Sequence, residues 1–342
     1  MELLNTLYVT LPESYLHLDN HTLRLEMGKE TKLRIPLHHL SSVVCFGNVT
    51  VSLPLMHRLA DDGITLVLLD RNGRFKARLE GAVSGNVLLR QTQFRAANNA
   101  EITLSIARNC VAGKIRNCRQ VLLRGAREAK NENDKTSLTR YALDLAAALR
   151  ALPKANDLDK LRGFEGEAAR QYFSAVNHLI REDIRKSFQM DGRTRRPPRD
   201  RINALLSFVY SLLMNDCRSA VEAAGLDPQI GFLHAVRPGR AALALDLMEE
   251  FRVFADRLVL SLINRTQIKS KDFDEREGGA VLLDGDARKT VLVAYQERKQ
   301  ENLSHSLLSA PVPLGLLPHL QARLLARTLR GDVADYLPFL VR

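Results

Sequence analysis

The spacing of apolar residues changes once along this chain, near residue 85, and that change limits the folds open to it. From Leu7 to about Glu80, short β-rich runs alternate with turn residues every few positions. From Val87 to Ile263, apolar residues recur instead at the 3.6-residue spacing of a helix. We therefore predict an α+β protein in which a small β-rich N-terminal domain, residues 1–85, precedes a larger all-α domain, residues 86–342.

Turn and breaker residues mark the expected elements within each domain. In the first domain, Asp19-Asn20 and Asn72-Gly73 are hairpin-type turns, and a short helix over Pro54–Ala60 ends at Gly63. In the second domain, the helical pattern is interrupted mainly at residues 131–134, 153–157, 191–199 and 238–239. Beyond these, we expect an exposed loop or short hairpin and two further helices, over residues 275–286, 287–300 and 316–329.

Several classes of protein are disfavoured by the sequence. The N-terminus lacks a basic segment followed by an apolar core, so we expect no secretory signal. The uncharged runs at 202–215 and 302–322 are too short, or too rich in proline, to cross a membrane. The four cysteines lack CxxC spacing, which predicts reduced core thiols in a cytoplasmic protein. Motifs for ATP, serine-hydrolase and dinucleotide chemistry are missing.

The net charge points to a polyanionic partner. Lysine and arginine total 50 against 39 acids, which gives a formal charge of +11. Solubility alone is the ordinary explanation of such an excess, and nucleic acid is the first functional candidate. Basic residues are densest in and beside one segment rich in glycine and proline, at Arg181, Arg185, Lys186, Arg193, Arg195, Arg196, Arg199 and Arg201. This segment is either a solvated loop or a phosphate-binding surface, and we favour the latter.

Acids on an apolar helix suggest a metal site. Asp246 and Glu249 are three residues apart in a helical pattern that is apolar on nearly every side, so their side chains should emerge on the same side of a buried helix. Buried carboxylates need a cation. With Glu165, which opens another amphipathic helix, and His234, they would suit Mn²⁺ or Mg²⁺ better than a structural Zn²⁺. The alternative is that nearby arginines pair with the acids, namely Arg237, Arg240 and Arg252.

The sequence segments around these residues resemble those of a known family. Three segments contain the four candidate ligands, namely GFEGEAARQYF, GFLHAVRPG and LALDLMEEF. Three further segments support the resemblance, namely RTRRPPRDRINALLSFVYSLL, LYVTLPESYLHLDNHTLRLE and YLPFLVR. They are similar to the CRISPR-associated integrase/endonuclease of the spacer-acquisition module, in the form found with type I-C systems. By that resemblance Glu165, His234 and Glu249 match the family's metal ligands, and Asp246 matches a nearby acid whose place relative to the ion stays open.

The resemblance also implies an activity and partners. It implies a metal-dependent catalytic helical domain, an N-terminal domain that dimerises, and a homodimer that joins a small ferredoxin-like CRISPR-associated protein in a heterohexameric integration complex. The substrates would be double-stranded and branched DNA, contacted by the basic segment together with Arg237 and Tyr210. The expected reaction inserts short foreign fragments into a CRISPR array by transesterification. Two alternatives stay open, a non-catalytic DNA-binding or scaffolding protein and a general repair nuclease for branched DNA.

Overall fold

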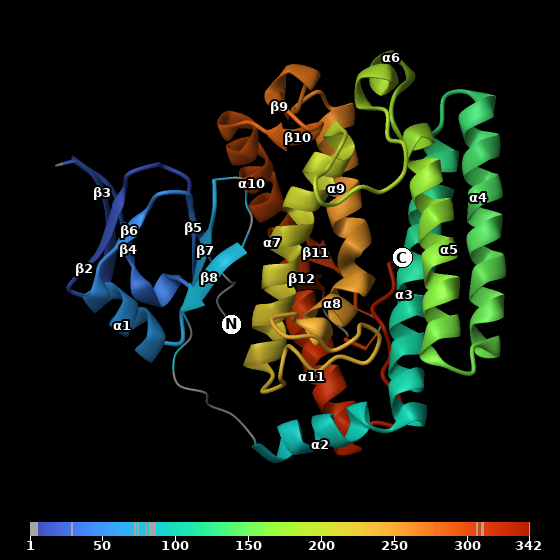
Figure 1. Ribbon diagram of the computed structural model, residues 1–342, viewed down its shortest axis with the longest axis horizontal. Coiled ribbons are helices and arrows are strands. Elements are labelled where there is room, and N and C mark those ends of the chain that lie inside the picture. The colour runs from blue at the N-terminus through green and yellow to red at the C-terminus, as the bar shows by residue number, and fades with distance from the viewer. Residues whose placement is uncertain are drawn as a thin grey trace. The chain divides into compact units, whose positions relative to one another are not determined.

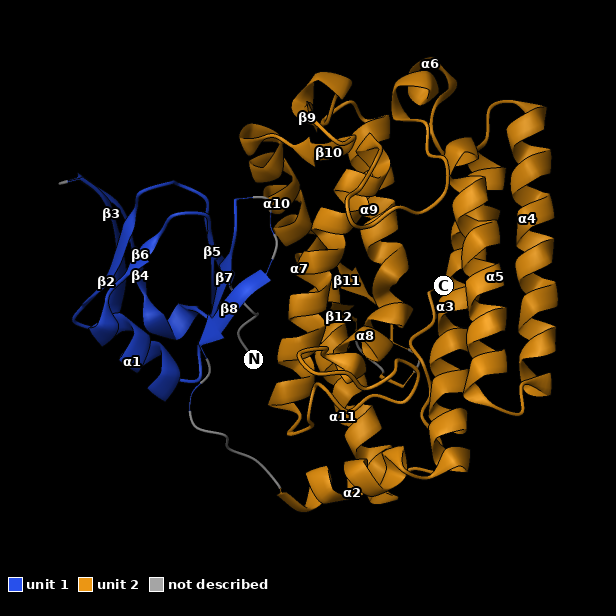
Figure 2. Cartoon of the chain, in the orientation of Figure 1, with its two compact units in different colours: residues 1–85 blue, residues 86–342 orange. Residues whose placement is uncertain are grey.

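The computed structural model describes residues 6–28, 30–71, 73, 75–79, 81, 87–305, 307–308 and 311–341. The chain divides into two compact units, residues 1–85 and 86–342 (Figure 2). The first is built mainly of strands and the second mainly of helices (Figure 1), so the predicted fold class is confirmed. Among the described helices, none is long and apolar enough to span a membrane.

In its described residues, the first unit contains two four-stranded sheets and one α-helix. One sheet has the order β1-β5-β7-β8, with the first three strands parallel, and the other has the order β4-β3-β2-β6. The elements are β1 (Thr6–Val9), β2 (Tyr15–Asp19), β3 (Thr22–Met27), β4 (Glu30–Pro36), β5 (Ser42–Phe46), β6 (Thr50–Val51), α1 (Leu53–Asp61), β7 (Thr65–Leu69) and β8 (Phe75–Leu79).

Alternation of side chains explains why these segments form half-buried strands. In β3, Leu23 and Leu25 are buried in a core shared by both sheets and α1, while Arg24 and Glu26 lie on the other face and pair. The expected turn after β2 is present, with Asn20 at a φ of 55°. In the second expected turn Gly73 has a φ of 80°, whereas Asn72 lies outside the described residues.

The second unit is a helical domain with two small hairpins. Its helices and strands are α2 (Val87–Ala97), α3 (Ala100–Glu128), α4 (Glu132–Ala151), α5 (Leu158–Ala175), α6 (Glu182–Arg185), α7 (Arg201–Ala223), α8 (Ala242–Met248), α9 (Arg252–Asn264), β9 (Phe273–Arg276), β10 (Ala280–Leu283), α10 (Gly285–Gln300), β11 (Asn302–Leu303), β12 (Val312–Pro313) and α11 (Leu317–Arg330). Helices α3, α4 and α5 lie side by side (Figure 1). All four cysteines are free and buried, as predicted.

Two features of the helical unit differ from the sequence-based expectation. Glu165 does not open its helix, because α5 begins at Leu158 after Asp157, whose carboxylate caps the backbone N–H of Lys160. Glu165 therefore lies about two turns inside α5. The break before α8 is also longer than predicted, since residues 224–241 form no helix; they carry His234.

Candidate functional site

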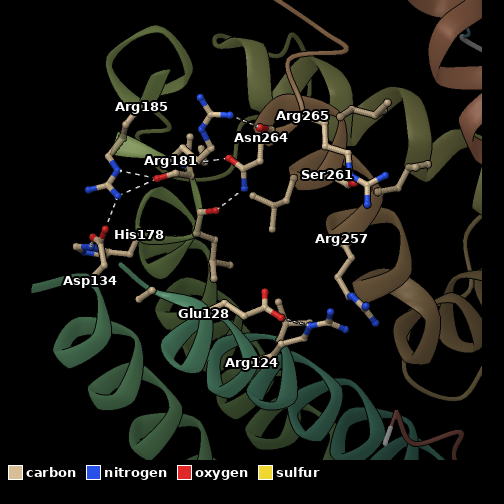
Figure 3. A pocket seen from close by; sticks show the side chains of 18 of the residues that line it. Arg124, Glu128, Asp134, His178, Arg181, Arg185, Arg257, Ser261, Asn264 and Arg265 are labelled. Carbon is tan, nitrogen blue, oxygen red and sulfur yellow. Dashed lines mark hydrogen bonds and ion pairs between the residues drawn. The ribbon is translucent and has the colours of Figure 1, made fainter. Parts of the chain in front are cut away.

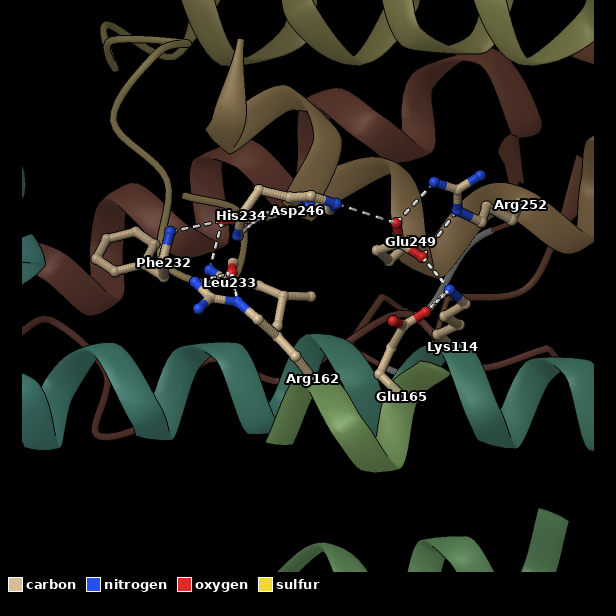
Figure 4. A network of polar contacts seen from close by, with 9 residues as sticks. All are labelled: Lys114, Arg162, Glu165, Phe232, Leu233, His234, Asp246, Glu249 and Arg252. Atoms are coloured by element: carbon tan, nitrogen blue, oxygen red, sulfur yellow. Dashed lines mark hydrogen bonds and ion pairs between the residues drawn. The ribbon is translucent and has the colours of Figure 1, made fainter. Parts of the chain in front are cut away.

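Glu249 is the buried acid at the centre of the candidate site (Figure 4). It begins a 3-10 turn, Glu249–Phe251, that joins α8 to α9, and it is 2% exposed. Arg252 donates to both of its oxygens, from Nε to Oε2 and from Nη2 to Oε1, at 2.7 Å each. The Nζ atom of Lys114 on α3 lies 2.7 Å from Oε2. The expected pairing of an acid with Arg252 is thus observed, and a lysine adds a second cation.

Glu165 reaches the same place from α5. Its Oε1 atom accepts a hydrogen bond from Lys114 Nζ, so one ammonium bridges carboxylates from two separate elements (Figure 4). The Glu165 side chain is 24% exposed, whereas that of Glu249 is almost inaccessible. The cluster therefore opens to solvent on the Glu165 side.

His234 lies between Asp246 and Glu249. Its Nδ1 atom is 2.7 Å from Asp246 Oδ1, and its Nε2 atom is 3.8 Å from Glu249 Oε1. An ionised carboxylate only accepts hydrogen bonds, so the proton of a neutral imidazole lies on Nδ1 and the lone pair of Nε2 faces Glu249. Asp246 and Glu249 therefore lie on opposite sides of the ring, rather than side by side as the helical spacing suggested.

Asp246 also holds the backbone that carries His234. Its oxygens accept the N–H groups of Phe232 at 2.5 Å, Leu233 at 3.0 Å and His234 at 2.9 Å. Gly231 permits this close approach, because a Cβ there would lie 2.7 Å from Asp246 Oδ2. With both oxygens occupied, Asp246 positions the imidazole.

Arg162 on α5 and Gln93 on α2 tie the same loop to the helices. Arg162 donates from Nε and Nη2 to the carbonyl of Leu233, at 2.9 and 2.7 Å. The Nε2 atom of Gln93 donates to the carbonyls of Asp227 and Ile230. Hydrogen bonds therefore fix the loop before His234 at residues 227, 230 and 233.

The charges of the cluster favour its ionised form. Burial alone would raise the pKa of Glu249, but Arg252 and Lys114 outweigh burial and lower the pKa well below its usual range. For Lys114, burial would lower the pKa, but the charges of Glu249 and Glu165, together with the hydrogen bond to Glu165, outweigh burial and raise the pKa. Both groups are therefore charged at neutral pH.

The donor set matches a hard divalent cation in type. Two carboxylates and one imidazole nitrogen suit Mn²⁺ or Mg²⁺. In the part of the chain that the structure describes, however, no three His, Cys, Asp or Glu side chains gather closely enough around one point to hold an ion. The Lys114 ammonium lies between Glu165 and Glu249 and contacts both.

Tyr210 is part of the supporting structure of this site. It is 7% exposed, and its hydroxyl donates to Asp256 Oδ1 at 2.5 Å. The guanidinium carbons of Arg193 and Arg252 lie 5.4 and 4.8 Å from its ring centroid. Tyr210 thereby connects the basic segment to the arginine that holds Glu249, and its buried place gives it no direct contact surface for DNA.

Apart from Tyr210, and from Arg181 and Arg185, which lie elsewhere, the predicted DNA-binding residues fall into two groups. Arg193 donates to Asn203 and Ser207, and Arg201 donates to Ser187 and Glu275, so these two side chains stabilise the fold of their segment. The others are exposed, and their side chains have no partner within the described residues; they are Lys186, Arg195, Arg196, Arg199 and Arg237. The exposed group is available to phosphates.

Arg185 belongs to a different region, a pocket of about 950 Å³ bounded by parts of α3, α6, α9 and α10 (Figure 3). It donates to Asp134 Oδ2 at 2.5 Å, and His178 Nδ1 lies 2.7 Å from the other oxygen of Asp134. Burial would raise the pKa of Asp134, but the hydrogen bonds from Arg185 and His178 lower it. The structure therefore separates Arg185 from the exposed arginines around Arg196.

Sequence reasoning missed Lys114 and the residues that fix the C-terminal segment. Lys114 is 8% exposed and lies one turn from the buried Cys110 and Cys118, so a charge on the apolar face of a helix was the available signal. Glu250 accepts hydrogen bonds from the hydroxyl of Tyr336 and from the N–H of Phe339 at 2.7 Å. No local sequence pattern links residues so far apart.

Comparison with known proteins identifies the family. The family described as CRISPR associated protein Cas1 matches residues 7–297. The chain belongs to the Cas1 family. It is similar to a CRISPR-associated endonuclease Cas1 of Moorella thermoacetica, with 57% identity over 99% of both chains. Among solved structures, this Cas1-family chain is similar to a Cas1 protein from Thermotoga maritima, with a TM-score of 0.81, 26% identity and 98% of each chain covered.

A second solved structure places a Cas1-like fold inside a larger polypeptide. It is a Cas6-RT-Cas1–Cas2 complex, which the Cas1-family chain matches with a TM-score of 0.82 and 26% identity. The match covers 98% of this chain and 36% of that one. The Cas1 fold thus occurs both alone and joined to other domains.

Proposed function

We propose that this Cas1-family chain is a metal-dependent DNA endonuclease and integrase that inserts short foreign DNA fragments into a CRISPR array. The observation that carries the proposal is the surroundings of the buried Glu249: Lys114 links it to Glu165, and His234 Nε2 lies 3.8 Å from its Oε1 atom, so residues from separate segments meet at one buried acid. The relatives' description as CRISPR-associated endonucleases supports the same reading. The excess of positive charge and the exposed arginines suit a DNA substrate.

The reaction is a transesterification at phosphorus. The 3′-hydroxyl oxygen of the incoming fragment forms a bond to a phosphorus of the repeat, the bond from that phosphorus to the leaving 3′-oxygen breaks, and the attacking hydroxyl's proton is passed on to the leaving oxygen. With water as the attacking group, the same exchange is endonuclease cleavage. When bound, Mg²⁺ or Mn²⁺ supplies Lewis acidity at the phosphoryl oxygen and lowers the pKa of the attacking group.

The chain's own residues would bind the ion and position the strands. Glu165, Glu249 and His234 Nε2 would hold the ion, and Asp246 keeps the imidazole proton on Nδ1 so that Nε2 is free to bind. Arg252 fixes the orientation of Glu249 through two parallel hydrogen bonds. The exposed arginines would hold the phosphates of the DNA backbone.

We further propose the partners that the family resemblance implies. The protein would form a homodimer through its β-rich unit and join a small ferredoxin-like Cas2 protein in a heterohexamer, in a system of type I-C. The similarity to a chain of a Cas6-RT-Cas1–Cas2 complex supports a Cas2 partner. Mass measurement of the protein mixed with its Cas2 partner tests this assembly.

A metal titration combined with paired histidine variants tests the catalytic proposal. We expect the purified protein to cut and join branched DNA with Mn²⁺, to stop with a chelator, and to lose activity in His234→Ala and Glu165→Ala while DNA binding is retained. His178→Ala is a matched control, because the Nδ1 atom of His178 also lies 2.7 Å from an aspartate oxygen. His178 lies outside the candidate site, in the pocket that contains Arg185. Full activity in His234→Ala and Glu165→Ala would show that the site is wrongly assigned.

One observation favours a second candidate, a DNA-binding or scaffolding protein without catalysis. The ion pairs of Arg252 and Lys114 already satisfy Glu249, as a purely structural cluster would require. In that case metal would change neither DNA cleavage nor strand transfer. Strand transfer into a plasmid with a CRISPR repeat, compared with one without it, separates integration from general repair of branched DNA.

A further inference from the structure

Lys114 stands out in the candidate site because it is a cation in the place proposed for another cation. Its side chain leaves the buried face of α3 and its Nζ atom contacts Glu165 Oε1 and, at 2.7 Å, Glu249 Oε2 (Figure 4). These two acids come from α5 and from the turn after α8. The lysine therefore joins three separate elements of the helical unit through one ammonium.

The charges around Lys114 are already balanced. The carboxylates of Glu165 and Glu249 face the cations of Lys114 and Arg252, which gives two negative and two positive charges. The charge of Asp246 is directed to backbone N–H groups and to the imidazole. A divalent ion added to this balanced set would be repelled by two buried cations, so its binding requires one of them to leave.

Of the two cations, Lys114 is the one able to leave. Arg252 donates two bonds in a rigid fork to Glu249 and lies over the ring of Tyr210. Lys114 has a flexible four-carbon stem, and Glu165, one of its two acceptors, is 24% exposed. Movement of the ammonium toward that open side frees one oxygen of each acid.

We propose that Lys114 is a built-in counter-cation that occupies the divalent-ion position of the metal-free site and is displaced when the ion binds. The inference rests on the proposed metal-dependent function. The lysine keeps the two carboxylates together without metal, and it lowers the affinity for metal because binding must first break its two ion pairs. Lys114 thus sets the metal concentration at which the site fills.

Calorimetric titration of the full chain with Mn²⁺ tests the competition. In Lys114→Met, which keeps the length of the side chain without its charge, we expect Mn²⁺ to bind on the order of tenfold more tightly than in the wild type. The matched control is Lys299→Met, because Lys299 is also buried and pairs with Asp216 at 2.9 Å outside the cluster. This control should bind Mn²⁺ with wild-type affinity.

Thermal unfolding gives a second readout that is independent of activity. Without metal, Lys114→Met should melt below the wild type, because the buried Glu249 and the half-buried Glu165 lose a cation. Added Mn²⁺ should raise the melting temperature of Lys114→Met by more than it raises that of the wild type. A third measurement needs no variant: Mn²⁺ should increase the labelling of Lys114 by an amine-reactive reagent, with labelling of Lys299 unchanged.

The outcomes separate this inference from the proposed function. Equal or weaker Mn²⁺ binding by folded Lys114→Met would overturn the displacement of Lys114 while the metal site stands. If Lys114→Met fails to fold, labelling of wild-type Lys114 that does not change with Mn²⁺ would overturn it instead. Wild-type protein that binds no Mn²⁺, or binds it equally well after Glu249→Gln, would remove the metal site and this inference together.

Discussion

The role of Asp246 can be tested by the single change Asp246→Asn. The carboxylate now accepts three backbone N–H groups and the Nδ1–H group of His234. An asparagine keeps one acceptor oxygen, which can serve Phe232 and Leu233, and places its NH₂ group at the other two donors. The NH₂ group can donate only to an unprotonated Nδ1, so the imidazole proton moves to Nε2 and the lone pair that faces Glu249 is lost.

The cost in stability follows from the same contacts. One buried N–H then lacks an acceptor, which costs about 1–3 kcal/mol, and two others lose charge assistance worth about 1 kcal/mol each. We expect the free energy of unfolding to fall by about 3–5 kcal/mol. Because Nε2 no longer has a free lone pair, Mn²⁺ affinity should fall about 10–100-fold.

Three measurements check this prediction. Chemical denaturation gives the change in stability, titration gives the Mn²⁺ affinity, and nitrogen-15 NMR of labelled histidines reports which ring nitrogen of His234 carries the proton. Asp256→Asn is the matched control, since Asp256 is also buried but bonds Tyr172 and Tyr210 instead of the imidazole. Folded Asp246→Asn with the proton still on Nδ1 and unchanged Mn²⁺ affinity would refute the reasoning.

Three further predictions concern pH, the C-terminal segment and DNA. Burial raises the pKa of Asp256 from 3.8 to about 6, so the folded protein holds this proton more tightly than the unfolded chain does. The free energy of unfolding of the wild type, relative to Asp256→Asn, should therefore be highest below about pH 4 and fall by about 3 kcal/mol as the pH rises to about 6, as denaturation at several pH values will show. Asn117→Ala removes three hydrogen bonds, two of them to the backbone of residues 339 and 341, and should lower the free energy of unfolding by about 2–4 kcal/mol in urea titration; an unchanged midpoint would contradict it. Arg199→Ala should weaken DNA binding and reduce the slope of log affinity against log salt by about 1, whereas Arg201→Ala, already paired with Glu275, should change that slope less; equal slopes in both variants would count against the exposed group as the phosphate contact.

The elements of the fold were predictable because they depend on local patterns. Alternation in β3 and the Ser52 cap with Pro54 in α1 are encoded within a few residues. The start of α5 differs from the expectation because the Asp157 cap begins the helix eight residues before Glu165. Glycine and proline between residues 225 and 239 were the signal for the long loop, but apolar residues among them continued the helical pattern.

The members of the candidate site were predictable by residue type, but their arrangement was not. A buried acid such as Glu249 predicts a nearby cation, but it does not identify that cation. Lys114 is 51 residues from Glu165 along the chain, so only the packing of α3 against α5 brings the two together. The helical spacing of Asp246 and Glu249 was misleading because α8 ends at Met248 and the tighter turn redirects the second acid.

Two adjacent glutamates in the turn after α8 connect residues 336–341 to the candidate site on the other side of that turn. Glu249 faces Lys114, while Glu250 holds Tyr336 and Phe339. Fraying of the chain's last residues would release the backbone one peptide unit from Glu249. Amide protons in the 3-10 turn and in residues 336–341 should therefore exchange with deuterium at matched rates, as one cooperative opening unit.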